Sequence, residues 1–340
     1  MISLANLSIS VLDPSPITVG GSPKESLENT LDLAKQAEQW GYHRYWLAEH
    51  HNWAGMASSA SPLIIGRVAS VTQKLRVGSG AMLLSHYSPL SVAEQFGTLE
   101  SFFPNRIDLG LGRAPGTDRL TANLLHRRIA DEPDFSEKLD ELYSYLYRSG
   151  IMTSDASQHF HAIPGEGTRV PIWLLGSGVY SAELAGRLGL PFSYAGHFSP
   201  SNMENALSIY RKSFRPSEVL NKPYVLLAVN VIAADEEKEA HRLATSSYQK
   251  YLLLTRGKPA QLRPPVDSMD NLWNSYERMA VEEQLSASLI GDPSSIKKQL
   301  ITLLEKTEAD EIMAHTEIFD HQARLRSYQI LADVRNSLGI

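Results

Sequence analysis

Short apolar segments alternate with amphipathic helical segments along most of this chain. Eight apolar segments have the length of a strand and cover residues 7–12, 43–48, 75–84, 106–112, 171–176, 191–196, 224–233 and 311–317. Nearly every one is followed by a segment with helical periodicity, and such alternation predicts a parallel sheet covered by helices. Because eight units occur without a long linker, an α/β fold of the (β/α)8 TIM-barrel type is favoured over an open, doubly wound sheet.

The predicted helices begin at recognisable capping sequences. Ser22-Pro23 and Ser61-Pro62 each combine a capping residue with a proline in the first turn. Ser88-Pro89 does the same, and Ser91 with Glu94 matches the spacing of a capping box. Gly41 is expected to end the first helix.

Two longer polar segments interrupt the alternation. They cover about residues 114–168 and 236–288, after the fourth and the seventh predicted strands, and both have helical character. We therefore expect one domain over residues 1–340, a barrel with two helical insertions. Because loops at the mouth of a barrel carry specificity, these insertions are expected to shape the substrate site.

The composition excludes several classes of protein. The formal net charge is −6, and no Lys/Arg cluster of the kind that binds nucleic acid is present. No apolar run reaches the roughly 20 residues of a membrane helix. The chain has no cysteine, which excludes disulfides, cysteine metal ligands and a cysteine nucleophile. The N-terminal segment has no basic region or cleavage site of a signal peptide, so a cytoplasmic location is expected.

Polar side chains follow the predicted strands at their carboxyl ends, where barrel enzymes place their active sites. Glu49, His50 and His51 follow the second strand within the sequence WLAEHHN. Adjacent residues of a strand point to opposite faces, so the two histidines cannot both face one ligand. His50 is a candidate for proton transfer near neutral pH, with a structural role as the alternative. His51 is expected to be structural.

A metal centre is the weaker hypothesis for these polar residues. Glu49, His86 and His197 are the side chains that a metal would have to gather. No H-x-H or comparable ligand spacing supports them, although a metal needs three or four convergent ligands. We therefore expect no metal site.

Two glycine-rich segments follow the fourth and the fifth predicted strands. They are Asp108 to Gly116, which contains Gly112-Arg113, and Gly176-Ser177-Gly178. Neither matches the G-x-G-x-x-G pattern with a following acidic residue, so a dinucleotide-binding fold is not supported. Backbone N–H groups, the Ser177 hydroxyl, a helix N-terminus and the Arg113 guanidinium together suit a phosphate monoester. A tight turn without a ligand is the alternative.

The third predicted strand contains the sequence VGSGAMLL, in which glycine alternates with other residues. Glycine inside a strand indicates a bulge or a close backbone approach. Gly80, Ala81 and Met82 are expected to form a flat apolar shelf on which a planar aromatic ring can lie. A glycine that is merely tolerated at a barrel corner explains the same residues.

Taken together, these segments resemble the bacterial luciferase-like flavin monooxygenase family. The resemblance covers most of the chain and is carried by WLAEHHN, LRVGSGAMLLSHYSP and AEQFGTLESFFPNRIDLGLGRAPG. It implies a (β/α)8 barrel that binds FMN or, in some branches, the deazaflavin F420. It also implies a non-prolyl cis peptide at Gly80-Ala81 beneath the flavin ring, and His50 beside the reactive edge of that ring.

The same resemblance assigns the phosphate to two segments. Gly110 to Arg113 matches the family's fourth strand, where Arg113 reaches the phosphate, and Ser177 with its neighbouring amides matches the other contact. The luciferases carry a reactive cysteine on the fourth strand, whereas this chain has Gly112 there. The light-emitting reaction is therefore not expected.

The function implied by the resemblance is oxygenation of a small organic substrate with O2 and reduced FMN, which a separate flavin reductase supplies. His50 acts as acid or base, and Glu49 or Asn52 is expected to fix its tautomer. The alternatives are F420-dependent hydride transfer on the same barrel, a metal-dependent hydrolase that uses His50, His86 and His197, and a non-catalytic flavin-binding protein. The family likeness also implies a homodimer through the helices near strands two to four.

Overall fold

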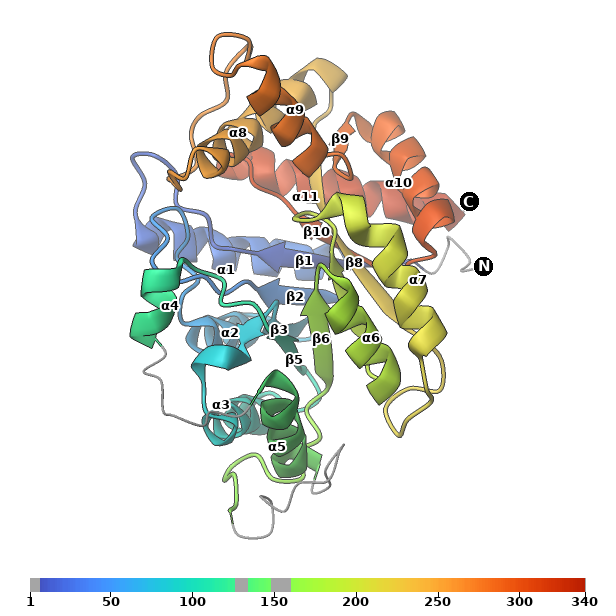
Figure 1. Cartoon of the computed structure of the whole chain (residues 1–340). Helices are drawn as coiled ribbons and strands as arrows, with labels where there is room; N and C mark the ends of the chain where they lie inside the picture. Colours follow the sequence, from blue (N-terminus) through green and yellow to red (C-terminus); the bar gives the residue numbers. More distant parts are fainter. Residues whose placement is uncertain (1–6, 126–133, 148–159, 340) are drawn as a thin grey trace.

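Eight parallel strands close into a barrel in the computed structural model, which describes residues 7–125, 134–147 and 160–339 (Figure 1). The barrel strands are β1 (Ser8–Asp13), β2 (Arg44–Leu47), β3 (Arg76–Ser79), β5 (Ile107–Gly112), β6 (Ile172–Gly176), β7 (Phe192–Ala195), β8 (Val225–Ala233) and β10 (Glu311–His315). β10 pairs with both β1 and β8, which closes the ring. The predicted TIM barrel is confirmed.

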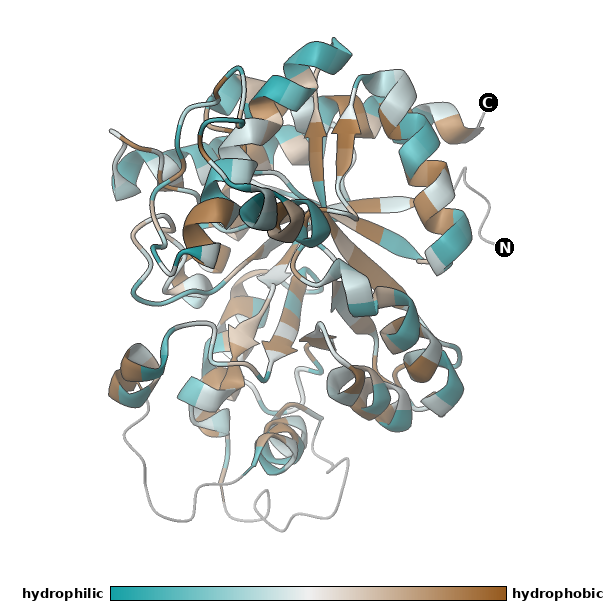
Figure 2. Cartoon of the chain, turned by 45° about the horizontal axis from the view of Figure 1, so that its top comes forward, coloured by the Kyte–Doolittle hydropathy of each residue, from teal (hydrophilic) through white to brown (hydrophobic). Residues whose placement is uncertain are grey.

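The helices lie outside the ring, as the apolar periodicity predicts. They are α1 (Pro23–Gln39), α2 (Ser61–Val71), α3 (Pro89–Phe102), α4 (Arg119–Leu125), α5 (Phe135–Tyr147), α6 (Val179–Leu188), α7 (Met203–Ser213), α8 (Glu237–Thr255), α9 (Ser275–Gln284), α10 (Pro293–Thr307) and α11 (His321–Asn336). Figure 2 shows that the strands are largely hydrophobic and that the helices turn hydrophilic residues outward. Within the described ranges, no helix is both long and apolar enough to cross a membrane.

The capping predictions are correct at α1 and wrong in detail at α3. Ser22 caps α1 by accepting a hydrogen bond from the backbone N–H of Glu25. At α3 the N-cap is Ser88, whose side chain makes no capping bond. Ser91 lies inside the helix, where its hydroxyl accepts a bond from Gln95 Nε2 at 3.1 Å, so the predicted capping box with Glu94 does not form.

The third predicted strand, residues 75–84, is divided in two. β3 ends at Ser79, and β4 (Met82–Leu83) pairs instead with the end of β5. Between them the Gly80–Ala81 peptide bond is cis, as the family resemblance implies. The division redirects the chain at the mouth of the barrel, where the shelf was predicted.

The two predicted insertions pack against different elements, since α5 contacts α3 whereas α8 contacts β8 and β9 (Leu289–Gly291). Part of the first one, residues 126–133 and 148–159, lies outside the described residues, and the remainder carries α4 and α5. The second contains α8 and α9 and ends in the unpredicted strand β9, which pairs with the last residues of β8. Leu262 of this insertion exchanges backbone bonds with the loop after β1, at Ile17 and Val19. The insertion is thereby fixed over the barrel mouth.

The inside of the barrel has an aromatic floor and a charged base. Trp46 and Trp173 meet edge to face with ring centroids 5.1 Å apart, in a cluster with Leu12, Ala228 and Met313. Below them the buried Arg44 bridges two carboxylates, Asp108 at 2.7 Å and Glu311 at 3.1 Å. The aromatic cluster lies between these buried charges and the mouth of the barrel, where the polar residues at the strand ends are found.

Candidate active site

A cavity of about 360 Å³ opens at the carboxyl ends of the barrel strands. The predicted site residues that line it are Glu49, His50, Gly80, Ala81, Gly112, Arg113, Gly176, Ser177 and Gly178. Other lining residues include Leu12, Tyr180, His197, Phe198, Ala228 and Met313. Its volume falls in the range of small-molecule and cofactor sites.

Met82 is the one predicted site residue that the structure places elsewhere. Its side chain is fully buried in the outer core and lies 4.0 Å from the hydroxyl of Ser61 on α2. Successive strand residues point to opposite faces. With Met82 facing the helices, the shelf at the cavity is made by Gly80 and Ala81.

His50 reaches the cavity with a defined protonation pattern. Its Nδ1 lies 3.1 Å from the carbonyl oxygen of Gly116. A carbonyl oxygen only accepts, so Nδ1 carries the proton of the neutral ring and Nε2 keeps its lone pair. The ring also meets Trp53 edge to face at 5.2 Å. Burial lowers the pKa of His50, and the nearby Lys250 ammonium acts in the same direction, so the ring is a neutral base near pH 7.

Glu49 does not orient His50, contrary to the prediction. Its carboxylate accepts a bond from Ser61 Oγ at 2.6 Å, and its other oxygen lies 3.3 Å from His51 Nε2. The Asn52 amide is also directed away from His50, because it donates to the hydroxyl of Thr121 at 2.9 Å. The tautomer of His50 is therefore set by a backbone carbonyl, for which no sequence motif exists.

Glycines bring the backbone close to the cavity on two sides. A Cβ atom on Gly80 would lie 2.7 Å from Leu12 Cδ1 and 3.1 Å from Trp46 Cβ. One on Gly112 would lie 3.1 Å from the Cβ of Ala81. Side chains at these positions would crowd the shelf. The surface that remains is flat and lined by small groups, which suits one face of a planar ring.

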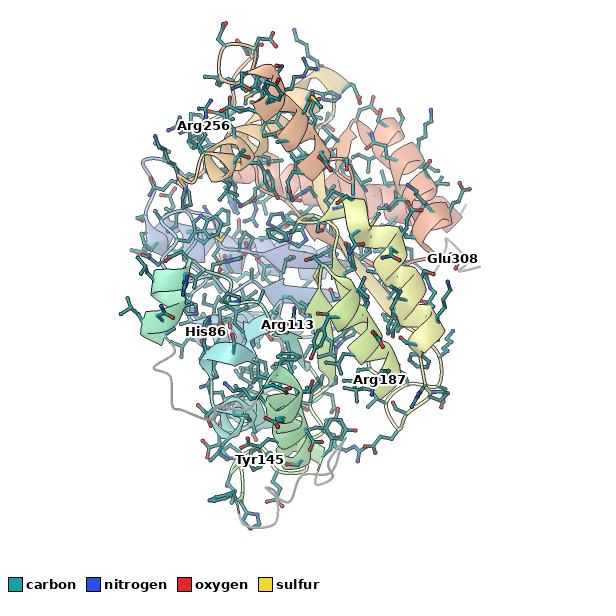
Figure 3. All side chains as sticks on the ribbon, viewed as in Figure 1. His86, Arg113, Tyr145, Arg187, Arg256 and Glu308 are labelled. Carbon is teal, nitrogen blue, oxygen red and sulfur yellow. The ribbon has the colours of Figure 1, made fainter. Side chains whose placement is uncertain are left out.

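The opposite end of the same wall is suited to an anion. The Arg113 guanidinium lies over the ring of Tyr180 at 4.2 Å. Among the described residues, no carboxylate pairs with Arg113, whose position is labelled in Figure 3. α6 begins beside it at Gly178, an N-cap that contributes no side-chain bond to the first turn. Its uncapped N–H groups and the positive end of its dipole favour a negative charge. Arg113, Ser177 and Gly178, the residues predicted to bind a phosphate, thus line one cavity.

A metal centre finds no support in this arrangement. In the ranges that the structure describes, no three His, Asp or Glu side chains converge as metal ligands would. His86 Nε2 donates to the carbonyl oxygen of Pro115 at 2.8 Å, so that nitrogen is already engaged. Within the described residues, the histidines of the hydrolase hypothesis do not form a group that could hold a metal ion.

Several residues at the site had no signal in the sequence. Tyr180 follows the glycine turn, where an aromatic residue facing the Arg113 guanidinium is not a recognised motif. Lys250 and Glu317, whose charged groups pair at 2.5 Å, are 67 positions apart in the chain. Only the folded barrel brings these groups to one place.

The sequence matches a known protein family along most of its length. A family model described as luciferase-like monooxygenase matches residues 7–311. The chain belongs to the luciferase-like monooxygenase family. It is 46% identical over 333 residues to a luciferase-like monooxygenase of Escherichia coli K12, with 98% of each chain covered. This membership supports an oxygenase enzyme.

Two relatives from Bacillus subtilis are also similar along their whole length. The uncharacterized protein YvbT is 54% identical over 326 residues, with 96% of each chain covered. N-acetyl-S-alkylcysteine monooxygenase is 31% identical over 329 residues, with 96% of this chain and 98% of that protein covered.

Solved structures share the barrel. MsnO8 in its apo form superposes with a TM-score of 0.84 at 32% identity, with 98% of each chain covered. The oxygenating constituent of 3,6-diketocamphane monooxygenase in complex with FMN has a TM-score of 0.72 at 17% identity, over 96% of this chain and 97% of that one. An F420-dependent secondary alcohol dehydrogenase has a TM-score of 0.66 at 16% identity, over 95% and 97% of the two chains. At such identities the last two show the fold alone.

Proposed function

We propose that this protein is a flavin-dependent monooxygenase that uses reduced FMN and O2 to oxygenate a small organic substrate. The observation that carries the proposal is one cavity with two chemically different ends. At one end lie an uncapped helix N-terminus and the Arg113 guanidinium, which pairs with no carboxylate of the described residues, and at another lies the neutral imidazole of His50. The flat shelf at Gly80 and Gly112 lies in the same cavity.

Each end has a defined task in this proposal. Arg113, Ser177 and the amides after Gly178 hold the phosphate, because a guanidinium and a helix N-terminus both stabilise a dianion. The shelf supports the ring, and the ring, when bound, supplies the redox chemistry with O2. His50 holds or accepts a proton at Nε2, while Gly116 keeps Nδ1 protonated.

The cofactor is the part of the proposal that a binding experiment decides. Titration of the protein with FMN, riboflavin and F420, followed by flavin fluorescence, should show FMN as the tightest ligand. Riboflavin lacks the phosphate, so its weaker binding would locate the phosphate contribution. Tighter binding of F420 than of FMN would instead support hydride transfer on the same barrel.

Formation of an oxygenated product distinguishes a monooxygenase from a protein that only binds flavin. With reduced FMN from an added flavin reductase, a substrate-dependent oxygenated product is expected. FMN binding without any such product, over a panel of small organic compounds, would support a non-catalytic flavin-binding role. The expected homodimer is tested independently by sedimentation velocity.

A further inference from the structure

Three histidines and one ion pair lie at the carboxyl ends of barrel strands other than the one that carries Arg113. His50 follows β2, His197 follows β7 and His315 ends β10, whereas Arg113 follows β5. In the closed strand order, β10 lies opposite β5, whereas β2 and β7 are each two strands away from β5. His50 and His197 line the cavity, and His315 is buried behind it.

A hydrogen bond fixes the ring of His315, and the ring of His197 packs against it. His197 and His315 are stacked at a tilt, with ring centroids 4.8 Å apart. Asn230 donates its amide N–H to the backbone carbonyl of His197 at 3.1 Å, and its carbonyl oxygen lies 2.9 Å from His315 Nδ1. That oxygen can only accept, so His315 is protonated at Nδ1 and its Nε2 is free of hydrogen when the ring is neutral.

A buried ammonium faces this group of rings. Lys250 Nζ on α8 lies 2.5 Å from Glu317 Oε2, and the two side chains are only 9% and 3% exposed. The same ammonium lies 6.0 Å from the centroid of Trp53, whose ring contacts His50. His315 Nε2 is 3.9 Å from the Glu317 carboxylate, beyond hydrogen-bond distance. The Glu317 carboxylate therefore forms its close ion pair with Lys250 and not with His315.

This arrangement opposes a positive charge on any of the three rings. Burial is the main cause of a lowered pKa at all three rings, and the pKa values of His197 and His315 lie well below the usual value. The Lys250 ammonium also lowers the pKa of each ring. Other groups act on single rings.

Glu49 raises the pKa of His50, Glu317 raises those of His50 and His197, Asp13 raises that of His315, and Arg324 lowers that of His315. His50 lowers the pKa of His197 and that of His315, and His315 lowers that of His197. Lys250 is the cation that acts on all three rings.

We propose that Lys250, held by Glu317, is a positioning residue that acts together with burial to keep His50, His197 and His315 uncharged, so that the cavity wall lined by His50 and His197 is able to accept protons. The ammonium acts through the imidazoles and does not line the cavity. The consequence for turnover rests on the proposed function, whereas the control of charge is testable in the protein without flavin.

The test is a histidine titration by NMR of flavin-free protein, with His50→Gln, His197→Gln and His315→Gln used to assign the resonances. In Lys250→Met, Glu317 is left without its cation, so the three histidines should titrate at higher pH, by about half a unit or more. In Glu317→Gln, the unpaired ammonium should shift them to lower pH. The double variant Lys250→Met/Glu317→Gln should return them toward the wild-type values.

Shifts of opposite sign are the decisive result, because general loosening of the fold would move both single variants in one direction. Lys306→Met removes a surface ion pair with Glu204 and should leave the three titrations unchanged. If neither single variant shifts them, or both shift them the same way, the proposal is wrong even when FMN binds. If Lys250→Met does not fold, Lys250→Arg should retain the wild-type titrations and Glu317→Gln still gives the downward shift.

Discussion

The Nδ1 atom of His50 lies 3.1 Å from the carbonyl oxygen of Gly116, a residue 66 positions later in the chain. This contact leaves Nε2 as a proton acceptor at the cavity. In His50→Ala we expect product formation to fall by about 10²–10⁴-fold, the range for loss of a general acid–base group. FMN affinity should be nearly unchanged, since the proposed phosphate contacts follow β5 and β6. Full turnover in this variant would remove His50 from the mechanism.

The pH dependence of the wild-type reaction should follow the same imidazole. Burial lowers the pKa of His50 from its usual value of 6.5, so the ring is neutral at pH 7 and becomes charged only at more acidic pH. We expect kcat/KM to be level through neutral pH and to fall as the pH drops through the lowered pKa. An acidic limb centred above pH 6.5 would contradict this assignment.

Arg113 is expected to act on the phosphate alone. Removing its guanidinium in Arg113→Ala should cost about 1.5–3 kcal/mol of FMN binding, which is about 10–100-fold in Kd. Riboflavin binding should not change. The matched control is Arg187→Ala. Arg187 is an exposed arginine near the C-terminal end of α6, away from Arg113 (Figure 3). Equal losses for FMN and riboflavin would place the guanidinium elsewhere.

Substitution by alanine should lower the free energy of unfolding at one glycine and leave it unchanged at another. A Cβ on Gly110 would lie 2.1 Å from the backbone oxygen of Ser79, whereas one on Gly178 would meet nothing within 4 Å. Because the clash is with backbone in a closed barrel, Gly110→Ala should lower the free energy of unfolding by about 3 kcal/mol. Gly178→Ala should leave it unchanged. Urea unfolding followed by circular dichroism measures both, and equal stability of the two variants would refute the argument.

The buried base of the barrel should make stability depend on pH. Burial opposes ionisation of Asp108, but Arg44 and Arg76 hold its pKa below the usual 3.8. A carboxyl with a lowered folded pKa adds stability above its unfolded pKa and loses it as the pH falls through the folded one. We therefore expect stability to decline below about pH 4.

The same site predicts a large effect of removing its cation. Arg44→Met leaves Asp108 and Glu311 without their shared partner and should cost about 3–5 kcal/mol at pH 7. The loss should shrink in acid, where the carboxyls are protonated. A loss that stays constant from pH 7 to acid would indicate a packing defect instead.

Much of the fold was predictable because it rests on local patterns. Short apolar segments and helices with period-3.6 apolar spacing, with helix starts such as Ser22-Pro23, indicated eight strand–helix units, and the rule that such strands pair in parallel led to the barrel. The split of residues 75–84 into β3 and β4, and the short strand β9, were not predicted. Both depend on which distant strand accepts their hydrogen bonds, β5 and β8, and no local pattern records that choice.

For the site, the sequence by itself determined which residues stand at the ends of strands, and so brought Arg113, Ser177 and His50 to one face of the barrel. Tertiary structure alone decided their partners. In the folded protein, His50 contacts the carbonyl oxygen of Gly116, and Glu49 contacts Ser61 and His51. Met82 packs in the outer core, and Lys250 pairs with Glu317. Periodicity specifies the face on which a side chain lies, whereas hydrogen bonds and charge pairs depend on distances between segments that meet only when the ring has closed.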